Sequence, residues 1–301
     1  MPTNNQNLNA RSFQPQFREL LRAVFGVQSY FGDFFQGGLD ALDGVQHNET
    51  AFYVKTSDIP VVVGNEYLKG ANVAFGTGTG NSTRFGPRTE IIYVDTPVPY
   101  TWGWVFHEGI DRHTVNNDVD AAIADRLELQ AQAKTRTFNR HHSDFIAASA
   151  GHGESLDEYT DEAIVALFDR LSAHFVNIEA VGIKVAKVNT TLYNSLVNGG
   201  LMVREKGSTV NIDGNELPLF KGFGIEQIPD DMFNTTGGDT YAAYAYITGI
   251  GKAFTGINTA RTIESEDFDG QALQGAGKAG EFVLDDNKIA IVAVEAPPLA
   301  P

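Results

Sequence analysis

A run of alternating glycine and threonine at residues 76–80 is the first stretch whose residue types and spacing could do chemistry. A phosphate-binding loop needs such glycines after a strand and at the start of a helix, followed by Lys and then Ser or Thr. Here residues 82–87 lead into another strand-like run, and no such pair follows. Residues 249–252 fail the same test, because Ala253 stands where a hydroxyl is needed. The first run therefore predicts the tip of a hairpin, and neither run predicts a phosphate site.

A pair of adjacent histidines, His141 and His142, is the next group that could bind a metal ion. Neighbouring residues point about a quarter-turn apart on a helix, whereas metal-binding pairs prefer an i, i+4 spacing. No Glu stands between suitably spaced histidines either. We therefore expect both side chains to be exposed to solvent or to lie in an interface.

An acidic run ends at Gly270, and its carboxylates are Glu264, Glu266, Asp267 and Asp269. A calcium loop would need ligands at regular alternate positions and a distal bidentate Glu. Glu281 is too far along the chain to serve as that ligand. The run predicts a solvated acidic loop.

Covalent catalysis finds little support in the remaining residues. The chain has no Gly-x-Ser-x-Gly motif, and its seven histidines have no motif context. Lys55 and Lys69 could in principle attack a side-chain amide on a neighbouring chain, but intersubunit ion pairs or solvent exposure explain them more simply. We therefore predict no catalytic, cofactor-binding or metal site, and no enzyme activity.

The composition bounds the class of protein. The 301 residues are 42% hydrophobic and 20% charged, which is typical of one large or two modest globular domains. A net charge of −16 argues against gripping phosphate backbones, since nucleic-acid affinity comes from Lys and Arg. Cysteine is absent, which excludes disulfides. No signal peptide or membrane-spanning run is visible, so we expect a cytoplasmic, non-membrane protein.

The element that must organise the chain is a helix predicted over residues 116–150. This stretch contains no Pro or Gly, Asn116 or Asn117 is a plausible N-cap, and Gly151 supplies a stop. A continuous helix of this length would span about 50 Å. Its apolar stripe is thin in the middle. We therefore expect a spine that a thin sheet supports on one side, with the other side exposed or in contact with neighbours.

The N-terminal region precedes this helix. Residues 1–16 predict an extended arm, and residues 17–27 predict a short amphipathic helix. Aromatic side chains then follow among glycines, and they need a surface to pack on: Tyr30, Phe31, Phe34 and Phe35. That surface could belong to their own domain or to a neighbouring chain, and the sequence leaves both open.

A long hairpin is predicted over residues 50–104, with two strands that return on each other around the glycine-rich tip. Residues 89–106 read as one long strand with bends at Pro97 and Pro99. A hairpin with no following helix cannot bury itself. It must lie on its own body or on another subunit.

The remaining elements alternate between helices and strands. We predict a helix over 155–176 with Thr160 as its N-cap, and a helix over 189–199 ended by Gly199 and Gly200. The last part, 260–296, predicts a strand, a glycine-rich loop, and two strands around a turn at 285–287. Further strands are predicted at 182–188, 208–229 and 240–257.

In this order of parts, and in residues 182–199 and 281–296, the chain resembles the major capsid protein of a tailed bacteriophage with the Hong Kong 97-type fold. It is particularly similar to major head proteins of siphophages that infect lactic-acid bacteria. The resemblance implies an α+β fold made of an N-terminal arm, a hairpin called the E-loop, and peripheral and axial domains. The implied bounds are 1–49 for the arm with its short amphipathic helix, 50–104 for the E-loop, 105–155 for the peripheral domain with its spine helix at about 116–150, 156–256 for the axial domain, and 257–301 for the return strands and tail.

The resemblance also implies a function. The protein would be a structural subunit that self-assembles as pentamers and hexamers into an icosahedral head enclosing double-stranded DNA, with a portal protein as a partner. It would be made in the host bacterial cytoplasm and reside in the virion. Some relatives carry an N-terminal scaffolding segment that is cut off. This chain begins with the arm, so we expect a separate scaffolding protein and no proteolytic maturation.

Candidate intersubunit contacts follow from the same resemblance. Arg84 and Arg88 near the hairpin tip would meet acidic partners on neighbours, and the full set of candidates is Arg11, Arg18, Arg22, Phe31, Phe34, Lys69, Arg84 and Arg88. The acidic balance would keep packaged DNA from adhering to the wall, because like charges repel. Two alternatives stay open: an encapsulin-like shell that encloses proteins, and a soluble β-rich enzyme or glycan-binding protein.

Overall fold

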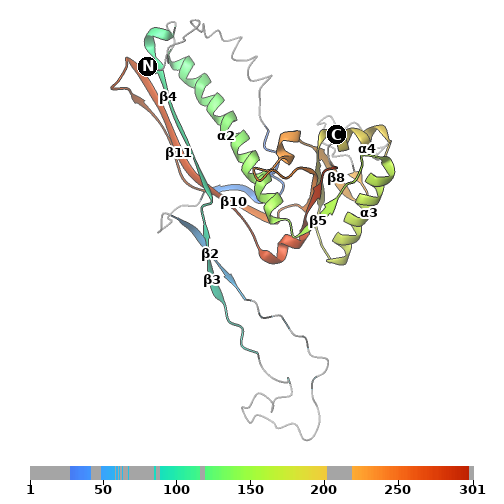
Figure 1. The fold of residues 1–301 in the computed structure, drawn as a ribbon. Coiled ribbons are helices and arrows are strands. Elements are labelled where there is room, and N and C mark those ends of the chain that lie inside the picture. Colours follow the sequence, from blue (N-terminus) through green and yellow to red (C-terminus); the bar gives the residue numbers. More distant parts are fainter. Residues whose placement is uncertain are drawn as a thin grey trace, which may run out of the picture. The chain divides into compact units, whose positions relative to one another are not determined.

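The computed structural model describes residues 28–41, 49–57, 89–115, 119–201 and 219–297, together with Ile59, Val61, Val63, Tyr67 and Phe85. The chain separates into two compact units. Unit 1 comprises Met1–Asp43 and Tyr100–Pro301, and unit 2 comprises Gly44–Pro99. Figure 1 shows the strands and helices of each unit.

A six-stranded sheet forms the centre of one part of unit 1. Its strands, in spatial order, are β5 (His152–Ser155), β12 (Ile291–Glu295), β9 (Tyr241–Ile247), β6 (Lys184–Val188), β8 (Phe223–Gln227) and β7 (Leu219–Phe220). The central strand β6 runs parallel to β8 and antiparallel to β9. Four of the five residues of β6 are buried, as expected for a strand in the interior of a sheet with both faces covered.

Two helices cover one face of this sheet: α3 (Asp161–Asn177) and α4 (Thr190–Asn198). The predicted caps Thr160 and Gly199 are confirmed, but the helix predicted from residue 155 begins only at Asp161, because Ser155 belongs to β5. The Thr160 side chain accepts a hydrogen bond from the backbone of Ala163, and α4 is capped by Asn189 and ends at Gly199. Residues of α3 at helical spacing are buried against the sheet: Ile164, Leu167, Phe168, Leu171 and Phe175.

The opposite face of the same sheet holds a second apolar cluster. Alternate residues of the strands, such as Tyr244 and Tyr246, meet Ile146 near the end of a long helix and the aromatic segment at residues 31–35. Both faces of the sheet are therefore buried within this chain. The open question about Phe31 and Phe34 is answered here, since both side chains are fully buried in their own chain.

A four-stranded sheet forms the other part of unit 1, with strand order β1 (Phe35–Ala41), β10 (Gly251–Glu264), β11 (Gly270–Val283) and β4 (Trp102–Asp111). β10 and β11 form a long antiparallel hairpin, and β4 pairs with β11 at the sheet edge. The predicted glycine-rich loop is therefore wrong, because those glycines lie inside β11. The turn predicted at 285–287 is also wrong in detail, since it begins the 3₁₀ helix η3 (Asp285–Ala290).

Two glycines of β11 make room for aromatic rings of β4. A Cβ atom on Gly277 would lie 2.4 Å from Cζ2 of Trp104, and one on Gly275 would already contact Trp104 and Phe106. In a strand, glycine often marks such a close approach. The glycines that suggested a loop are thus explained by the indole that lies over them.

The long helix α2 (Val119–Ser149) contains 31 residues and lies along β4 and β11 in Figure 1. Its end agrees with the predicted spine helix, whereas the predicted caps Asn116 and Asn117 lie outside the described residues. Two short 3₁₀ helices, η1 (Arg112–Thr114) and η2 (Asp230–Phe233), complete unit 1. In the described part of the chain, no helix has both the length and the apolar character to span a bilayer.

Unit 2 contains a two-stranded antiparallel ribbon of β2 (Thr50–Thr56) and β3 (Val94–Pro99). Lys55 Nζ lies 3.9 Å from Asp95 across the ribbon. The single long strand predicted over 89–106 is wrong, because β3 ends at Pro99 and β4 begins at Trp102 with a different partner. Proline has no N–H for a ladder, which favours a break at this point.

The packing of Trp104 on β11 gives a first test. Gly277→Ala should lower the free energy of unfolding by about 1–3 kcal/mol, because the new methyl group overlaps the indole. Gly153→Ala in β5 is the matched control, since a Cβ there meets no atom within 4 Å. Urea unfolding followed by circular dichroism measures both. Equal stability of the two variants would contradict this account.

Candidate functional site

The contact between α2 and β4 is aromatic over much of its length. Every second residue of β4 faces the helix. Trp102 stacks on His141, with ring centroids 3.9 Å apart, and meets the edge of Phe138 at 4.7 Å. Two residues further along β4, the Trp104 ring faces the helix, and Lys134 Nζ lies 3.9 Å from the centroid of that ring. These cation–π and stacking contacts supply attraction where the helix has few large apolar side chains.

A buried carboxylate, Glu281 on β11, joins three elements at the base of this contact. Its side chain is only 3% exposed. It accepts hydrogen bonds from Trp102 Nε1 at 3.0 Å and from Thr101 Oγ1 at 3.3 Å, and His142 Nδ1 lies 3.0 Å away. A buried carboxylate without such partners would be strongly unfavourable. We call Glu281 with Thr101, Trp102 and His142 the Glu281 clasp.

The clasp corrects the prediction for the two histidines. His142 is buried and bonded to Glu281, and His141 is half-buried under Trp102, so neither is simply exposed to solvent. Burial lowers the pKa of His141, against an opposing electrostatic effect of Glu281. Among the described residues, no group of three or more His, Asp or Glu side chains is placed to hold a metal ion.

A second ionic contact joins β4 to α2 nearer the start of the helix. Glu108 accepts a hydrogen bond from Arg126 Nε at 2.7 Å and from Gln130 Nε2 at 2.6 Å, and it forms an ion pair with the same guanidinium. The Arg126 hydrogen bond lowers the pKa of Glu108 below its ordinary value, although partial burial opposes this effect.

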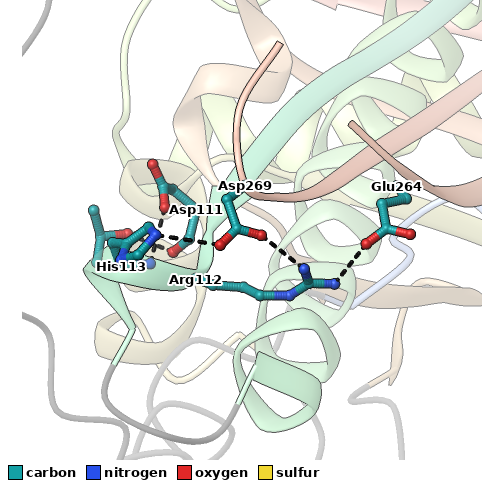
Figure 2. A network of polar contacts seen from close by, with 6 residues as sticks. Asp111, Arg112, His113, Glu264 and Asp269 are labelled. Carbon is teal, nitrogen blue, oxygen red and sulfur yellow. Dashed lines mark hydrogen bonds and ion pairs between the residues drawn. The ribbon is translucent and has the colours of Figure 1, made fainter. Parts of the chain in front are cut away.

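The acidic run near Gly270 takes part in a third contact, shown in Figure 2. Arg112 bridges two carboxylates, with Nη1 2.8 Å from Asp269 and Nη2 2.9 Å from Glu264. His113 Nε2 lies 3.2 Å from the other oxygen of Asp269. The predicted acidic loop is exposed, yet two of its carboxylates tie the β10–β11 hairpin to the end of β4.

The segment at residues 28–35 is held by polar bonds as well as by apolar burial. Lys187 on β6 is fully buried, and its Nζ lies 3.1 Å from Asp33 and contacts Glu226. Tyr246 donates a hydrogen bond to the same Asp33 oxygen at 3.1 Å. Asn139 of α2 bonds the backbone at both Gln28 and Tyr30. The N-terminal part of the described chain is therefore fixed to both the sheet and α2.

The predicted intersubunit residues divide into two groups. Phe31 and Phe34 belong to the buried cluster just described, so they are not presented to another copy. The others lie outside the described residues: Arg11, Arg18, Arg22, Lys69, Arg84 and Arg88. Of these candidates the structure therefore places only Phe31 and Phe34, and it places them together in the buried cluster.

The ribbon of unit 2, together with residues 91–93 that lead into β3, instead presents exposed apolar side chains. Tyr93 is 64% exposed, and its neighbours share this character: Tyr53, Ile91, Ile92 and Val94. Large apolar groups that gather in this way mark a contact surface more often than isolated ones do. The sequence already contained this signal, because a lone two-stranded ribbon cannot cover its own side chains.

Sequence reasoning did not identify Glu281, Trp102 or Arg112. A signal for Glu281 was present, since it lies two residues from Ala279 and two from Val283 and so shares their buried side of the strand. A charged residue at such a position needs a partner. Its partners could not be found from sequence, because His142 is 139 residues away.

The Glu281 clasp can be tested by removing the carboxylate. Glu281→Ala should lower the free energy of unfolding by roughly 3 kcal/mol, because buried donors lose their acceptor. Glu281→Gln should cost less, since its carbonyl can still accept the Trp102 bond. Glu266→Ala, in the exposed acidic loop, is the control. Chemical unfolding followed by tryptophan fluorescence measures the effect, and a Glu281→Ala protein as stable as the control would refute the clasp.

The Glu108 contact predicts a dependence on pH. The folded pKa of Glu108 is depressed, so its stabilising effect is complete above the ordinary Glu pKa. It declines as the pH falls below that value, and it is lost once the pH falls through the lower folded pKa. Unfolding free energies measured by urea between neutral and acid pH should show this decline. Glu108→Gln should lack that component, and identical profiles would contradict the assignment.

No protein-family model matches this sequence, and a search of curated proteins finds no relative. Solved structures do match. The capsid structure of cyanophage P-SCSP1u aligns over 92% of this chain and 94% of its own, with a TM-score of 0.63 and 11% identity. The mature capsid of bacteriophage PhiM1 aligns over 92% and 89%, with a TM-score of 0.60 and 11% identity.

A third match is the capsid of a native GTA particle, which covers 91% of this chain and 92% of its own at a TM-score of 0.51 and 11% identity. At such low identity these likenesses establish the fold. The chain therefore has the α+β fold of phage capsid proteins, the Hong Kong 97-type fold.

Proposed function

We propose that this chain is the major capsid protein of a tailed phage, and that it assembles as pentamers and hexamers into an icosahedral head around double-stranded DNA. The likeness in fold to phage capsid structures over nearly the whole chain carries this proposal. On this proposal the protein has no catalytic task. Its work is to tile a closed surface and to resist internal pressure.

The exposed ribbon of unit 2 supports assembly. Two strands alone do not form a stable structure in water, and here the strands and residues 91–93 before β3 carry several exposed large apolar side chains. A neighbouring copy that covers the ribbon would bury this area and order the strands. The ribbon then provides the E-loop contact between subunits.

The contacts along α2 support the mechanical part of the proposal. The Glu281 clasp, the Glu108–Arg126 pair and the Arg112 bridge lie at successive points along the contact of β4 with its neighbours. Directional contacts spread along β4, two of them with α2, oppose sliding better than an apolar stripe alone. Such a unit would keep its shape when neighbours pull on its ends.

The division into parts stays a proposal, with the arm at 1–49, the E-loop at 50–104, the peripheral domain at 105–155, the axial domain at 156–256 and the return strands at 257–301. We assign α2 and the four-stranded sheet mainly to the peripheral part. The six-stranded sheet with α3 and α4 belongs mainly to the axial part. The C-terminal strands contribute to both parts, because β11 belongs to the four-stranded sheet and β12 belongs to the six-stranded sheet.

The partners follow from the same proposal: other copies of the chain, a separate scaffolding protein, a portal protein, and DNA held without sequence-specific contacts. Assembly takes place in the host cytoplasm and the product resides in the virion. The net charge of −16 would limit adhesion of DNA to the wall. Arg11, Arg18, Arg22, Lys69, Arg84 and Arg88 remain proposed contacts with acidic groups on neighbours.

Negative-stain electron microscopy of the full chain tests the function. The purified protein, alone and with its scaffolding protein, should give closed shells or ring-shaped pentamers and hexamers. A protein that stays monomeric at high concentration and binds a small ligand or glycan would contradict the proposal.

The ribbon gives a more specific prediction. Ile92→Asp and Tyr93→Asp should each reduce the yield of particles by about tenfold or more, because an unpaired charge in a desolvated contact costs over 1.4 kcal/mol. Ala173→Asp adds the same charge on the exposed side of α3 and is the control. Particle yield is measured by sedimentation. Normal yield from both ribbon variants, each still folded by circular dichroism, would reject this contact.

A further inference from the structure

The sheet that supports α2 is covered by that helix on one face. The other face is exposed in part, whereas Phe254 on that side is buried beside Tyr100. Strand register separates the two faces, since residues paired directly across β4 and β11 point to the same side. Trp104 and its partner Gly277 lie on the covered side, under α2. The other side is the open face, which we define by His107 and Val105 of β4, Gln274, Ala276 and Lys278 of β11, and Arg261 of β10.

Charge is divided between the two faces by sign. Three of the four acidic residues of these strands are on the α2 side of the sheet by register: Glu108, Glu264 and Glu281. The open face carries Arg261, Lys278 and His107. Asp111 lies at its far end, where its carboxylate accepts the backbone N–H of His113. A basic face stands out in a chain with 38 acidic and 22 basic residues.

Arg261, a charged group of the open face, is held in a row of polar side chains. Arg261 Nε donates to Gln274 Oε1 at 2.9 Å, and Gln274 Nε2 lies 3.3 Å from His107 Nε2. The row thus crosses all three strands. The Nε bond orients the guanidinium plane without using its two terminal nitrogens, which suit a carboxylate. Less side-chain entropy is then lost when a partner binds.

The middle of the open face is flat and apolar. Val105 is 74% exposed, and it lies directly opposite the exposed Ala276. Antiparallel sheets often face water on one side, so exposure alone has little meaning. An apolar centre with charged side chains around it is different, because it has the anatomy of a protein–protein interface.

We propose that the open face binds an acidic surface of a second copy of this chain. This inference depends on the proposed assembly and names a partner surface within it. Charge complementarity selects the occupant, because every other copy has a net charge of −16. The described chain has exposed acidic residues that would suit such a contact, for example Asp157, Glu158, Asp161 and Glu162 around the start of α3.

The open face is too small to hold two copies together by itself. A stable interface buries about 800 Å² on each partner, whereas the apolar centre here consists of two small side chains. The contact therefore acts together with the ribbon contact and fixes the orientation of neighbours. Its electrostatic part should weaken as salt screens the charges.

A double charge reversal, Arg261→Glu with Lys278→Glu, tests the proposal in the full-length protein. The variant should stay folded, because the changes are on the surface, and its particle yield at low ionic strength should fall by about tenfold or more. The control is Arg136→Glu with Lys288→Glu, which reverses the same charge outside the open face. Circular dichroism, sedimentation and electron microscopy provide the readouts, and the wild-type yield should also fall as salt is raised.

The possible outcomes separate a failure of the open-face contact from a failure of the proposed function. Normal particles from the Arg261/Lys278 variant would overturn the open-face contact while leaving the proposed function intact. A wild-type chain that forms neither rings nor shells would contradict the function itself. A short DNA duplex serves as a third probe. If the unassembled wild type binds it, the variant does not, and both assemble equally, the open face binds phosphate and this proposal is wrong.

Discussion

Burial of one carboxylate constrains the rest of unit 1. Glu281 lies where β4 begins, β11 ends and α2 passes over both, and its charge is tolerated because three side chains reach it. Each partner comes at a fixed geometry, so the register of β4 on β11 and the rotation of α2 are set together. A helix with a continuous apolar stripe would need no such group. α2 has only a patchy stripe, so polar contacts must fix its position.

The other contacts of α2 follow the same logic. Aromatic rings of β4 fill the space that the helix leaves, and glycines of β11 let the Trp104 ring approach the backbone. Glu108 and Arg112 then tie the far end of the sheet to α2 and to the β10–β11 hairpin. A rigid rod with a thin sheet results, while the main apolar cores lie on both faces of the six-stranded sheet.

The surfaces that remain describe an incomplete molecule. The ribbon of unit 2 exposes apolar side chains. The open face of the four-stranded sheet exposes basic side chains, although the protein as a whole is acidic. The ribbon provides apolar area that can be buried, which strengthens a contact. The open face provides charged side chains, which can fix the orientation of the partner. This combination suits a protein whose proposed function is to assemble with its own copies.

The sequence by itself determined the local structure. Helical spacing and caps located α3 and α4, the lack of Pro and Gly located α2, and the bare hairpin indicated a surface in need of a partner. Only the tertiary structure decided that Phe31 and Phe34 are buried in their own chain, that Gly277 lies under an indole, and that His142 meets Glu281. It also decided which face each charge occupies. Periodicity shows which residues share a side, but pairing across more than a hundred residues depends on register and packing, which no local pattern contains.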